Sequence, residues 1–203
     1  MQEIKNVIFD IGNVLIDFCW KKAFDNMNLE PEIWERLRKA TVGNQAWNEF
    51  DRGILSEEEI LDWFIRNDPE IESVIRDFME NHYSEIIEKF DYANNWVRTL
   101  KEHGFKIYFL SNFSRKGFEV FDEELNFVKD GDGAIISYEV NQIKPDRDIY
   151  ESLLDTYKLN PKECVFIDDT EPNLVTAREF GINTIHFEGY EKVVSELKAM
   201  GVE

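Results

Sequence analysis

The sequence has few cysteines, histidines and prolines, and it lacks any long apolar run. Its two cysteines, Cys19 and Cys164, show neither metal-ligand spacing nor a disulfide pattern, so we expect buried thiols in a reducing cytoplasm. The longest apolar runs, such as residues 107–110, are far too short to span a bilayer. Residues 1–5 lead directly into an apolar strand pattern, so no signal peptide is expected. These absences favour a cytoplasmic protein over a secreted or membrane-spanning one.

Basic residues are scarce as well, since 23 Lys and Arg stand against 42 Asp and Glu and leave a net charge of −19. Such an acidic chain repels phosphate backbones and anionic lipids, which argues against nucleic-acid or membrane binding as its main role. In contrast, 43% hydrophobic and 14% aromatic residues suffice for a packed core and argue against wholesale disorder. A length of 203 residues corresponds to one domain, or to one domain with a modest insertion. The composition leaves the oligomeric state open.

The two ends of the chain alternate short apolar runs with helix-period segments. Strands are expected at residues 4–9, 106–110, 134–138, 164–167 and 183–187. Apolar residues at helical spacing predict helices at residues 92–102, 146–157 and 173–180. Strands that alternate with helices predict an α/β fold with a Rossmann-like, mostly parallel sheet and helices on both faces.

The middle of the chain, residues 18–90, is expected to be helical and to contain no strand. Ser56 and Glu59 form a capping box at the start of an amphipathic segment, and Pro31 and Pro69 suit the first turns of two further helices. We therefore predict an α/β core domain of residues 1–17 and 91–203. A helical cap domain of residues 18–90 would be inserted after the first strand.

Reactive or phosphate-binding residue types stand at the ends of the expected strands and beside one helix start. In chain order they are Asp10, Ser111-Asn112, Lys144, and Asp168-Asp169 with Asn173 four residues later. Each alone is ordinary turn or cap chemistry, but parallel strands bring their carboxyl ends to one crevice. The two adjacent aspartates would also repel unless a cation, a proton or hydrogen-bond donors compensate them.

Together these residue types can perform phosphoryl transfer. A carboxylate such as Asp10 can form and then lose an aspartyl-phosphate. Because nucleophile and phosphate are both anionic, a divalent cation must bridge them, and Asp10 and Asp169 offer the oxygen ligands that Mg²⁺ prefers. Lys144 can offset charge on the transferring group, while Ser111 and Asn112 can donate hydrogen bonds to phosphate oxygens.

The sequence resembles the haloacid dehalogenase superfamily over nearly its whole length. Segments 9–15, 110–112, 144–145 and 166–169 with Asn173 are similar to its four motifs, and the helical block is similar to the C1-type cap of its phosphatases. Segments 12–15, 52–56 and 143–146 look closer still to the α-D-glucose-1-phosphatase-like branch.

This resemblance implies a role for each motif residue. Asp10 would be the nucleophile and a Mg²⁺ ligand, with the Gly12 carbonyl and Asp169 as further ligands. Asp168 and Asn173 would support the ion from outside its coordination sphere. Phosphate would be held by Ser111, Asn112 and Lys144.

One position departs from the superfamily's pattern. Most of its phosphatases carry an aspartate two residues after the nucleophile as general acid, and here that position is Gly12. Asp17 could stand in if the loop curls back, although capping of the first cap helix is the more ordinary role for it. Without an acid, acyl and aryl phosphates should react faster than sugar 1-phosphates, and primary 6-phosphates should react slowest.

The cap contains one candidate specificity segment, residues 43–47. It combines a glycine and amide side chains with an aromatic ring, so Asn44 and Trp47 are candidate substrate contacts. Aromatic residues in a small helical cap are nevertheless more often its core.

Three functions are compatible with these residues. The leading interpretation is a Mg²⁺-dependent phosphatase of a small phosphorylated metabolite, with a sugar phosphate such as a sugar 1-phosphate as the expected substrate. A non-catalytic member that binds a phosphometabolite or a protein is the alternative. A metal-independent dehalogenase is the third, and the charge of Asp168 and Asp169 argues against it.

Overall fold

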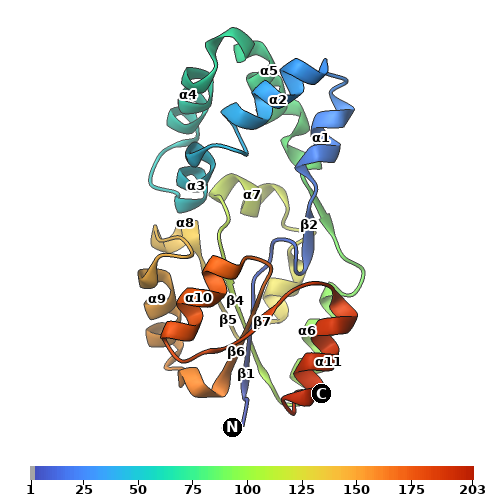
Figure 1. Cartoon of the computed structure of the whole chain (residues 1–203), viewed down its shortest axis with the longest axis vertical. Coiled ribbons are helices and arrows are strands. Elements are labelled where there is room, and N and C mark those ends of the chain that lie inside the picture. The colour runs from blue at the N-terminus through green and yellow to red at the C-terminus, as the bar shows by residue number, and fades with distance from the viewer. Residues whose placement is uncertain (1–2) are drawn as a thin grey trace.

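The computed structural model describes residues 3–203, which form a sheet layer flanked by helices and a separate lobe of helices (Figure 1). Residues 1 and 2 of the predicted core segment lie outside this description. The main sheet is built from β1 (Asn6–Phe9), β4 (Lys106–Ser111), β5 (Gly133–Ile136), β6 (Cys164–Asp168) and β7 (Asn183–His186). These strands are parallel and run in the order β5-β4-β1-β6-β7.

Helices cover both faces of this sheet, which confirms the predicted fold class (Figure 1). They are α6 (Ala93–Glu102) and α11 (Tyr190–Ala199) on one side, and α9 (Arg147–Tyr157) and α10 (Glu171–Glu179) on the other. The alternation of side chains along β1 sets the two faces. Phe9 meets Trp96 of α6 edge-on with ring centroids 4.7 Å apart, whereas Ile8 belongs to the buried cluster of Leu153 and Leu174.

The helical lobe packs around an aromatic core that includes Phe24, Phe50, Phe64 and Phe78. Its helices are α1 (Trp20–Asn26), α2 (Pro31–Ala40), α3 (Gln45–Arg52), α4 (Glu57–Asn67) and α5 (Glu72–Asp77). The capping box before α4 is confirmed, because the Glu59 N–H donates to Ser56 Oγ and the Ser56 N–H donates back to Glu59 Oε2. Short 3₁₀ or π turns follow at Pro69–Ile71, Phe78–His82 and Tyr83–Glu85.

A two-stranded antiparallel ribbon lies where the chain passes between the sheet layer and the lobe. It pairs β2 (Ile16–Phe18) with β3 (Ile87–Lys89), so the expectation that residues 18–90 contain no strand is wrong. Strands of three residues are too short to show the alternation that identifies a strand in sequence. The predicted domain boundaries, at 17/18 and 90/91, fall within β2 and just after β3, and they stay a prediction.

A second difference concerns the predicted strand 134–138. The observed strand β5 ends at Ile136, and Ser137 begins the short helix α8 (Ser137–Val140). The Ser137 hydroxyl explains the change, since it accepts the Phe113 N–H at 2.8 Å and donates to the Asp51 carbonyl at 2.6 Å. The remaining elements are α7 (Arg115–Val120) and 3₁₀ turns at Asn126–Asp130 and Pro161–Glu163.

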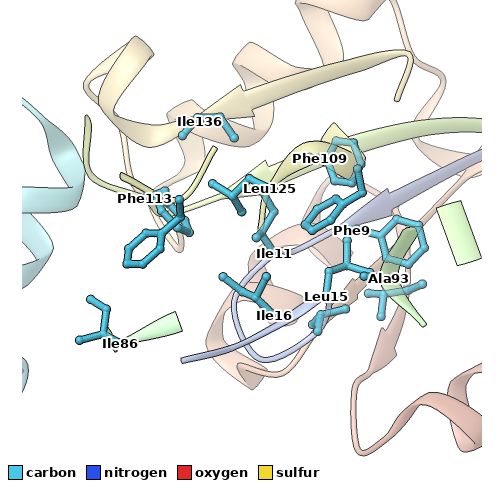
Figure 2. Packing of buried hydrophobic residues seen from close by; sticks show 14 of the residues in the cluster. Phe9, Ile11, Leu15, Ile16, Ile86, Ala93, Phe109, Phe113, Leu125 and Ile136 are labelled. Atoms are coloured by element: carbon cyan, nitrogen blue, oxygen red, sulfur yellow. The ribbon is translucent and has the colours of Figure 1, made fainter. Parts of the chain in front are cut away.

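The loop after β1 is held by its own apolar side chains. Ile11, Leu15 and Ile16 are buried, and they lie in the same cluster as Phe9 and Phe109 (Figure 2). This packing fixes the path of residues 11–15 beyond the sheet edge. Across residues 3–203, every helix is too short or too polar to cross a membrane.

Candidate active site

Asp10 lies directly beyond β1, where the strand order reverses and α/β sheets form their ligand crevice. It is 7% exposed. Three donors converge on its Oδ1 atom: the Ile11 N–H at 2.7 Å, the Ser111 hydroxyl at 2.9 Å and Lys144 Nζ at 2.8 Å. Within residues 3–203 no hydrogen bond reaches Oδ2, so that oxygen is available to a ligand. Burial raises the pKa of Asp10 to about 7, while Lys144 opposes this shift and Asp168 adds to it.

Lys144 joins two carboxylates inside the sheet edge. Its Nζ atom lies 2.8 Å from Asp10 Oδ1 and 2.7 Å from Asp168 Oδ2, and the residue is 4% exposed. Burial alone would lower the pKa of Lys144, but the charges of Asp10 and Asp168 outweigh it and raise the pKa above its ordinary value. The lysine is therefore charged throughout the neutral range.

Asn112 positions the main chain of this lysine. Its side chain accepts the Lys144 N–H at 2.8 Å and donates to the Lys144 carbonyl at 2.9 Å. The predicted phosphate contact of Asn112 must therefore come from its main chain while these bonds hold. Ser111, which is 1% exposed, donates to Asp10 in this structure, and rotation of its hydroxyl would direct the same proton elsewhere.

The two adjacent aspartates after β6 have different surroundings. Asp168 is fully buried and accepts hydrogen bonds from Lys144, the Thr170 N–H and the Asn173 side chain, at 2.7 to 3.1 Å. Asp169 is more exposed and is bonded by Asn13 Nδ2 at 2.9 Å. Carboxylate oxygens of Asp10, Asp168 and Asp169 lie within 4.8 Å of one another. Charged and main-chain donors thus compensate Asp168. In contrast, Asp10 Oδ2 has no donor among the described residues, and Asp169, which also accepts the Thr170 hydroxyl at 3.2 Å, is the more accessible of the two aspartates.

The loop residues Gly12 and Asn13 lie in the same cavity as Asp10 and Asp169. Asn13 has a φ of +55°, a left-handed conformation that asparagine tolerates, and its Oδ1 atom accepts the Phe18 N–H. It connects the loop to Asp169, a role that sequence reasoning missed although asparagine after a glycine is a turn signal. Gly12 borders open space, since a Cβ atom built there meets no atom within 4 Å.

A cavity of about 220 Å³ lies between these residues and the helical lobe. Its floor contains Asp10, Gly12, Asn13, Asn112, Lys144, Asp169, Thr170 and Asn173. The rest of its wall is mostly apolar and contains Ile16, Phe18, Trp47, Asp51, Tyr83, Ile86, Ile87, Phe113 and Ser114.

Only one of the two predicted cap contacts reaches this cavity. Trp47 lines it, and its ring packs on Phe18 at 5.8 Å and on Phe64 at 6.0 Å between centroids. Asn44 is not part of the lining. It caps the start of α3 by accepting the Ala46 N–H and donating to the Lys39 carbonyl, so we assign it no substrate contact.

Asp51, in the last turn of α3, is a cavity residue that the motifs did not indicate. Burial, with a contribution from the charge of Asp10, raises the pKa of Asp51 to about 8. A usable sequence signal exists, because an acidic residue at a helix C-terminus opposes the helix dipole and needs another reason to be there.

Asp17, the other predicted acid, points away from the cavity. It is exposed in β2, whereas its neighbours Ile16 and Phe18 line the cavity, as alternation along a strand requires. It does not cap the first cap helix either, since the N-cap of α1 is Cys19.

Comparison with known proteins agrees with this geometry. Flavin mononucleotide hydrolase 1 of Arabidopsis thaliana is 25% identical over 159 residues, which are 77% of this chain and 62% of the plant protein. A sesquiterpene phosphatase of Aspergillus oryzae is 22% identical and aligns over 97% of this chain and 96% of its own length.

A solved structure with the same fold is the magnesium complex of the HAD family enzyme bt-2542 from Bacteroides thetaiotaomicron. It superposes with a TM-score of 0.76 at 20% identity and covers 95% of this chain and 99% of its own. The closer resemblance to the α-D-glucose-1-phosphatase-like branch stays a prediction. Residues 4–181 match the model of the haloacid dehalogenase-like hydrolases, which is most of the sequence, and the chain therefore belongs to that family.

Proposed function

We propose that the chain is a Mg²⁺-dependent phosphatase that hydrolyses a small phosphate monoester through an aspartyl-phosphate on Asp10. The observation that carries this proposal is the buried contact of Lys144 with Asp10 beside the partly exposed carboxylate of Asp169. Relatives that are named as a flavin mononucleotide hydrolase and a sesquiterpene phosphatase support it. So does a structural neighbour solved with magnesium and inorganic phosphate.

The oxygen atoms at this edge suit a magnesium ion. Three carboxylates lie within 4.8 Å of one another, and hard oxygen ligands are those that Mg²⁺ prefers. Because donors already surround Asp168, we assign the ligands to Asp10, Asp169 and the Gly12 carbonyl, with Asp168 and Asn173 as supports. The bound ion would supply positive charge against the substrate's phosphate.

The chain's own residues account for the remaining chemistry. Asp10 attacks phosphorus, and Lys144 offsets the charge of nucleophile and phosphoryl group. The Ser111 hydroxyl and the Asn112 main chain are placed to donate to phosphate oxygens.

The apolar wall favours a compact leaving group with a large apolar face. A sugar 1-phosphate, the substrate class expected from the sequence, would find only Asp51, Tyr83 and Ser114 as polar side chains in this wall, and the last two already bond each other at 3.0 Å. Sugar hydroxyls left unpaired there would be costly to bury. We therefore place compact aryl and alkyl phosphates above sugar phosphates. We also propose a cytoplasmic location, which the two free cysteines support.

The proposal is tested by assaying phosphate release from aryl, alkyl and sugar phosphates with Mg²⁺ and with EDTA. We expect release that requires Mg²⁺ and competition by beryllium fluoride, an aspartyl-phosphate mimic. Halide release from 2-haloacids in EDTA would instead support the dehalogenase alternative. Binding of beryllium fluoride without turnover of any ester would support the non-catalytic alternative.

Removal of one proposed ligand should change the metal requirement. Asp169→Ala should raise the Mg²⁺ concentration for half-maximal activity about tenfold or more, since metal-site changes cost this much. The measurement is a Mg²⁺ titration of initial rate, with Glu171→Gln as control because that exposed carboxylate pairs only with Arg178 among the described residues. An unchanged Mg²⁺ requirement in Asp169→Ala would show that the ion binds elsewhere.

A further inference from the structure

The loop after β1, residues 11–15, contains no carboxyl group that could protonate the leaving group. Gly12 stands where the acid is expected, and Asp17 faces away from the cavity. Asp10, Asp51 and Asp169 are the carboxyl groups among the described residues that line the cavity. Two of these are assigned to the nucleophile and the metal, which leaves Asp51.

We propose that Asp51, supplied by the helical lobe, is the catalytic acid that protonates the departing oxygen. This inference rests on the proposed phosphatase activity. Asp51, in α3 of the helical lobe, lines the same cavity as Asp10, Lys144 and Asp169, so the leaving group of a phosphate held on Asp10 would share this cavity with the Asp51 carboxyl group.

The position of Asp51 is fixed against the loops that carry the phosphate-binding residues. Its carbonyl accepts the Ser137 hydroxyl at 2.6 Å, and that same hydroxyl accepts the Phe113 N–H at 2.8 Å. The neighbouring Arg52 carbonyl accepts Asn141 Nδ2 at 3.1 Å, three residues before Lys144. These contacts fix the position of residue 51 of the helical lobe relative to the loops that contain the phosphate-binding residues.

The surroundings of Asp51 favour its protonated form. Burial and the negative charge of Asp10 act in the same direction and raise its pKa to about 8, and the Ser114 N–H opposes them only in part. The basic neighbour Arg52 is directed elsewhere, toward Glu49 and Asp146. A carboxylic acid with its proton in place is the form that can act as donor.

The proton balance closes over two steps. When an Asp10 oxygen bonds to phosphorus, the ester P–O bond breaks and its electron pair stays on the leaving oxygen. The Asp51 proton moves to that oxygen, so an alcohol departs and Asp51 becomes a carboxylate. Water then attacks phosphorus and breaks the Asp10–phosphoryl bond, while Asp51 takes one proton from the water. Phosphate leaves, Asp10 is again a carboxylate and Asp51 is again protonated.

The test uses Asp51→Asn in the full chain with Mg²⁺, and it follows leaving-group release in a single turnover. The esters are p-nitrophenyl, phenyl and alkyl phosphate, in order of increasing need for a proton. We expect p-nitrophenol release within a few-fold of wild type. Release of phenol and alcohol should fall by ~10²–10⁴-fold, the usual contribution of a positioned acid.

Two further variants make the outcome specific. Asp17→Asn is the matched control and should behave as wild type on all three esters. Gly12→Asp added to Asp51→Asn should restore alkyl phosphate cleavage at least tenfold, because the space beside Gly12 is open to a side chain. Rescue also shows that the variant is folded.

Equal losses on all three esters, wild-type behaviour of Asp51→Asn, or the selective loss appearing in Asp17→Asn would each overturn the assignment. Those results differ from failure of the proposed function. In that case wild type itself would release no leaving group from any ester, or would do so equally in EDTA, and the assignment of Asp51 would fall with it.

Discussion

Asp10→Asn is expected to lower turnover by ~10⁴-fold or more, the scale on which removal of a covalent nucleophile acts. The amide keeps the shape of the side chain and can still accept the Ile11 N–H and the Ser111 hydroxyl. It loses the charge that attacks phosphorus, and its contact with Lys144 loses its ionic part. The measurement is steady-state phosphate release at saturating Mg²⁺, with circular dichroism to confirm folding.

Asp132→Asn is the matched control for this variant. Asp132 also pairs with a lysine, Lys106 at 2.9 Å, and accepts a main-chain N–H, from Ile107. It precedes β5 and so lies at the amino ends of the parallel strands, whereas Asp10 lies at their carboxyl ends. The control should keep its activity. Turnover of Asp10→Asn within tenfold of wild type would remove Asp10 from the mechanism.

Lys144→Met is expected to reduce both stability and turnover. It leaves Asp10 and Asp168 buried without their shared cation, and breaking a buried ion pair in this way costs ~3–5 kcal/mol. For a chain of this size the melting temperature should fall by about 10 °C. Turnover, assayed well below that temperature, should fall by ~10²–10³-fold for the loss of one electrostatic stabiliser.

The pH dependence of this destabilisation has a definite sign. Lys144 lowers the pKa of Asp10, which burial raises to about 7, so its removal raises that pKa further. A carboxyl group whose pKa is higher in the folded state lowers the free energy of unfolding as pH rises. The loss begins near its pKa in the unfolded state, about 4, and continues up to its pKa in the folded state. The gap between variant and wild type in chemical unfolding should therefore widen from pH 5 to pH 8.

Lys129→Met is the control for loss of a lysine from an ion pair. Lys129 pairs with Asp122 at 2.8 Å, and both side chains are mostly exposed. Exposed pairs contribute ~0–1 kcal/mol, so this variant should melt close to wild type at every pH. A Lys144→Met variant that is equally stable, or whose deficit shrinks as pH rises, would contradict the electrostatic account of the site.

The elements that sequence predicted well are those whose burial follows a local period. The strands near residues 4–9, 106–110, 164–167 and 183–187 differ from the observed strands by at most two residues at either end. The parallel arrangement then required Asp10, Ser111 and Asp168 to meet at one edge, and the contacts of Lys144 show that they do. Hydrophobic periodicity can be read in a short window of sequence. The right-handed connections between parallel strands then restrict how the predicted strands can be arranged.

The local sequence pattern does not predict which contacts residues 18–90 make with the rest of the chain. Strands β2 and β3 form only because residues about 70 positions apart are brought together. The same packing explains why Asn44 caps a helix while Trp47 lines the cavity. In each case the decisive contact is remote in sequence, so no periodicity marks it.

The sequence by itself determined the α/β class, the family and the candidate site residues Asp10, Ser111, Lys144 and Asp169, because strand ends and residue types are local properties. Only the tertiary structure decided the surroundings of the two aspartates: Asp168 is buried beside Lys144, whereas Asp169 is more exposed and is bonded by the side chains of Asn13 and Thr170. It also decided that Asp51 and not Asp17 faces the cavity. The physical reason is that burial and hydrogen-bond partners of a polar side chain depend on segments that fold against it, such as Ser137 on Asp51 across 86 residues.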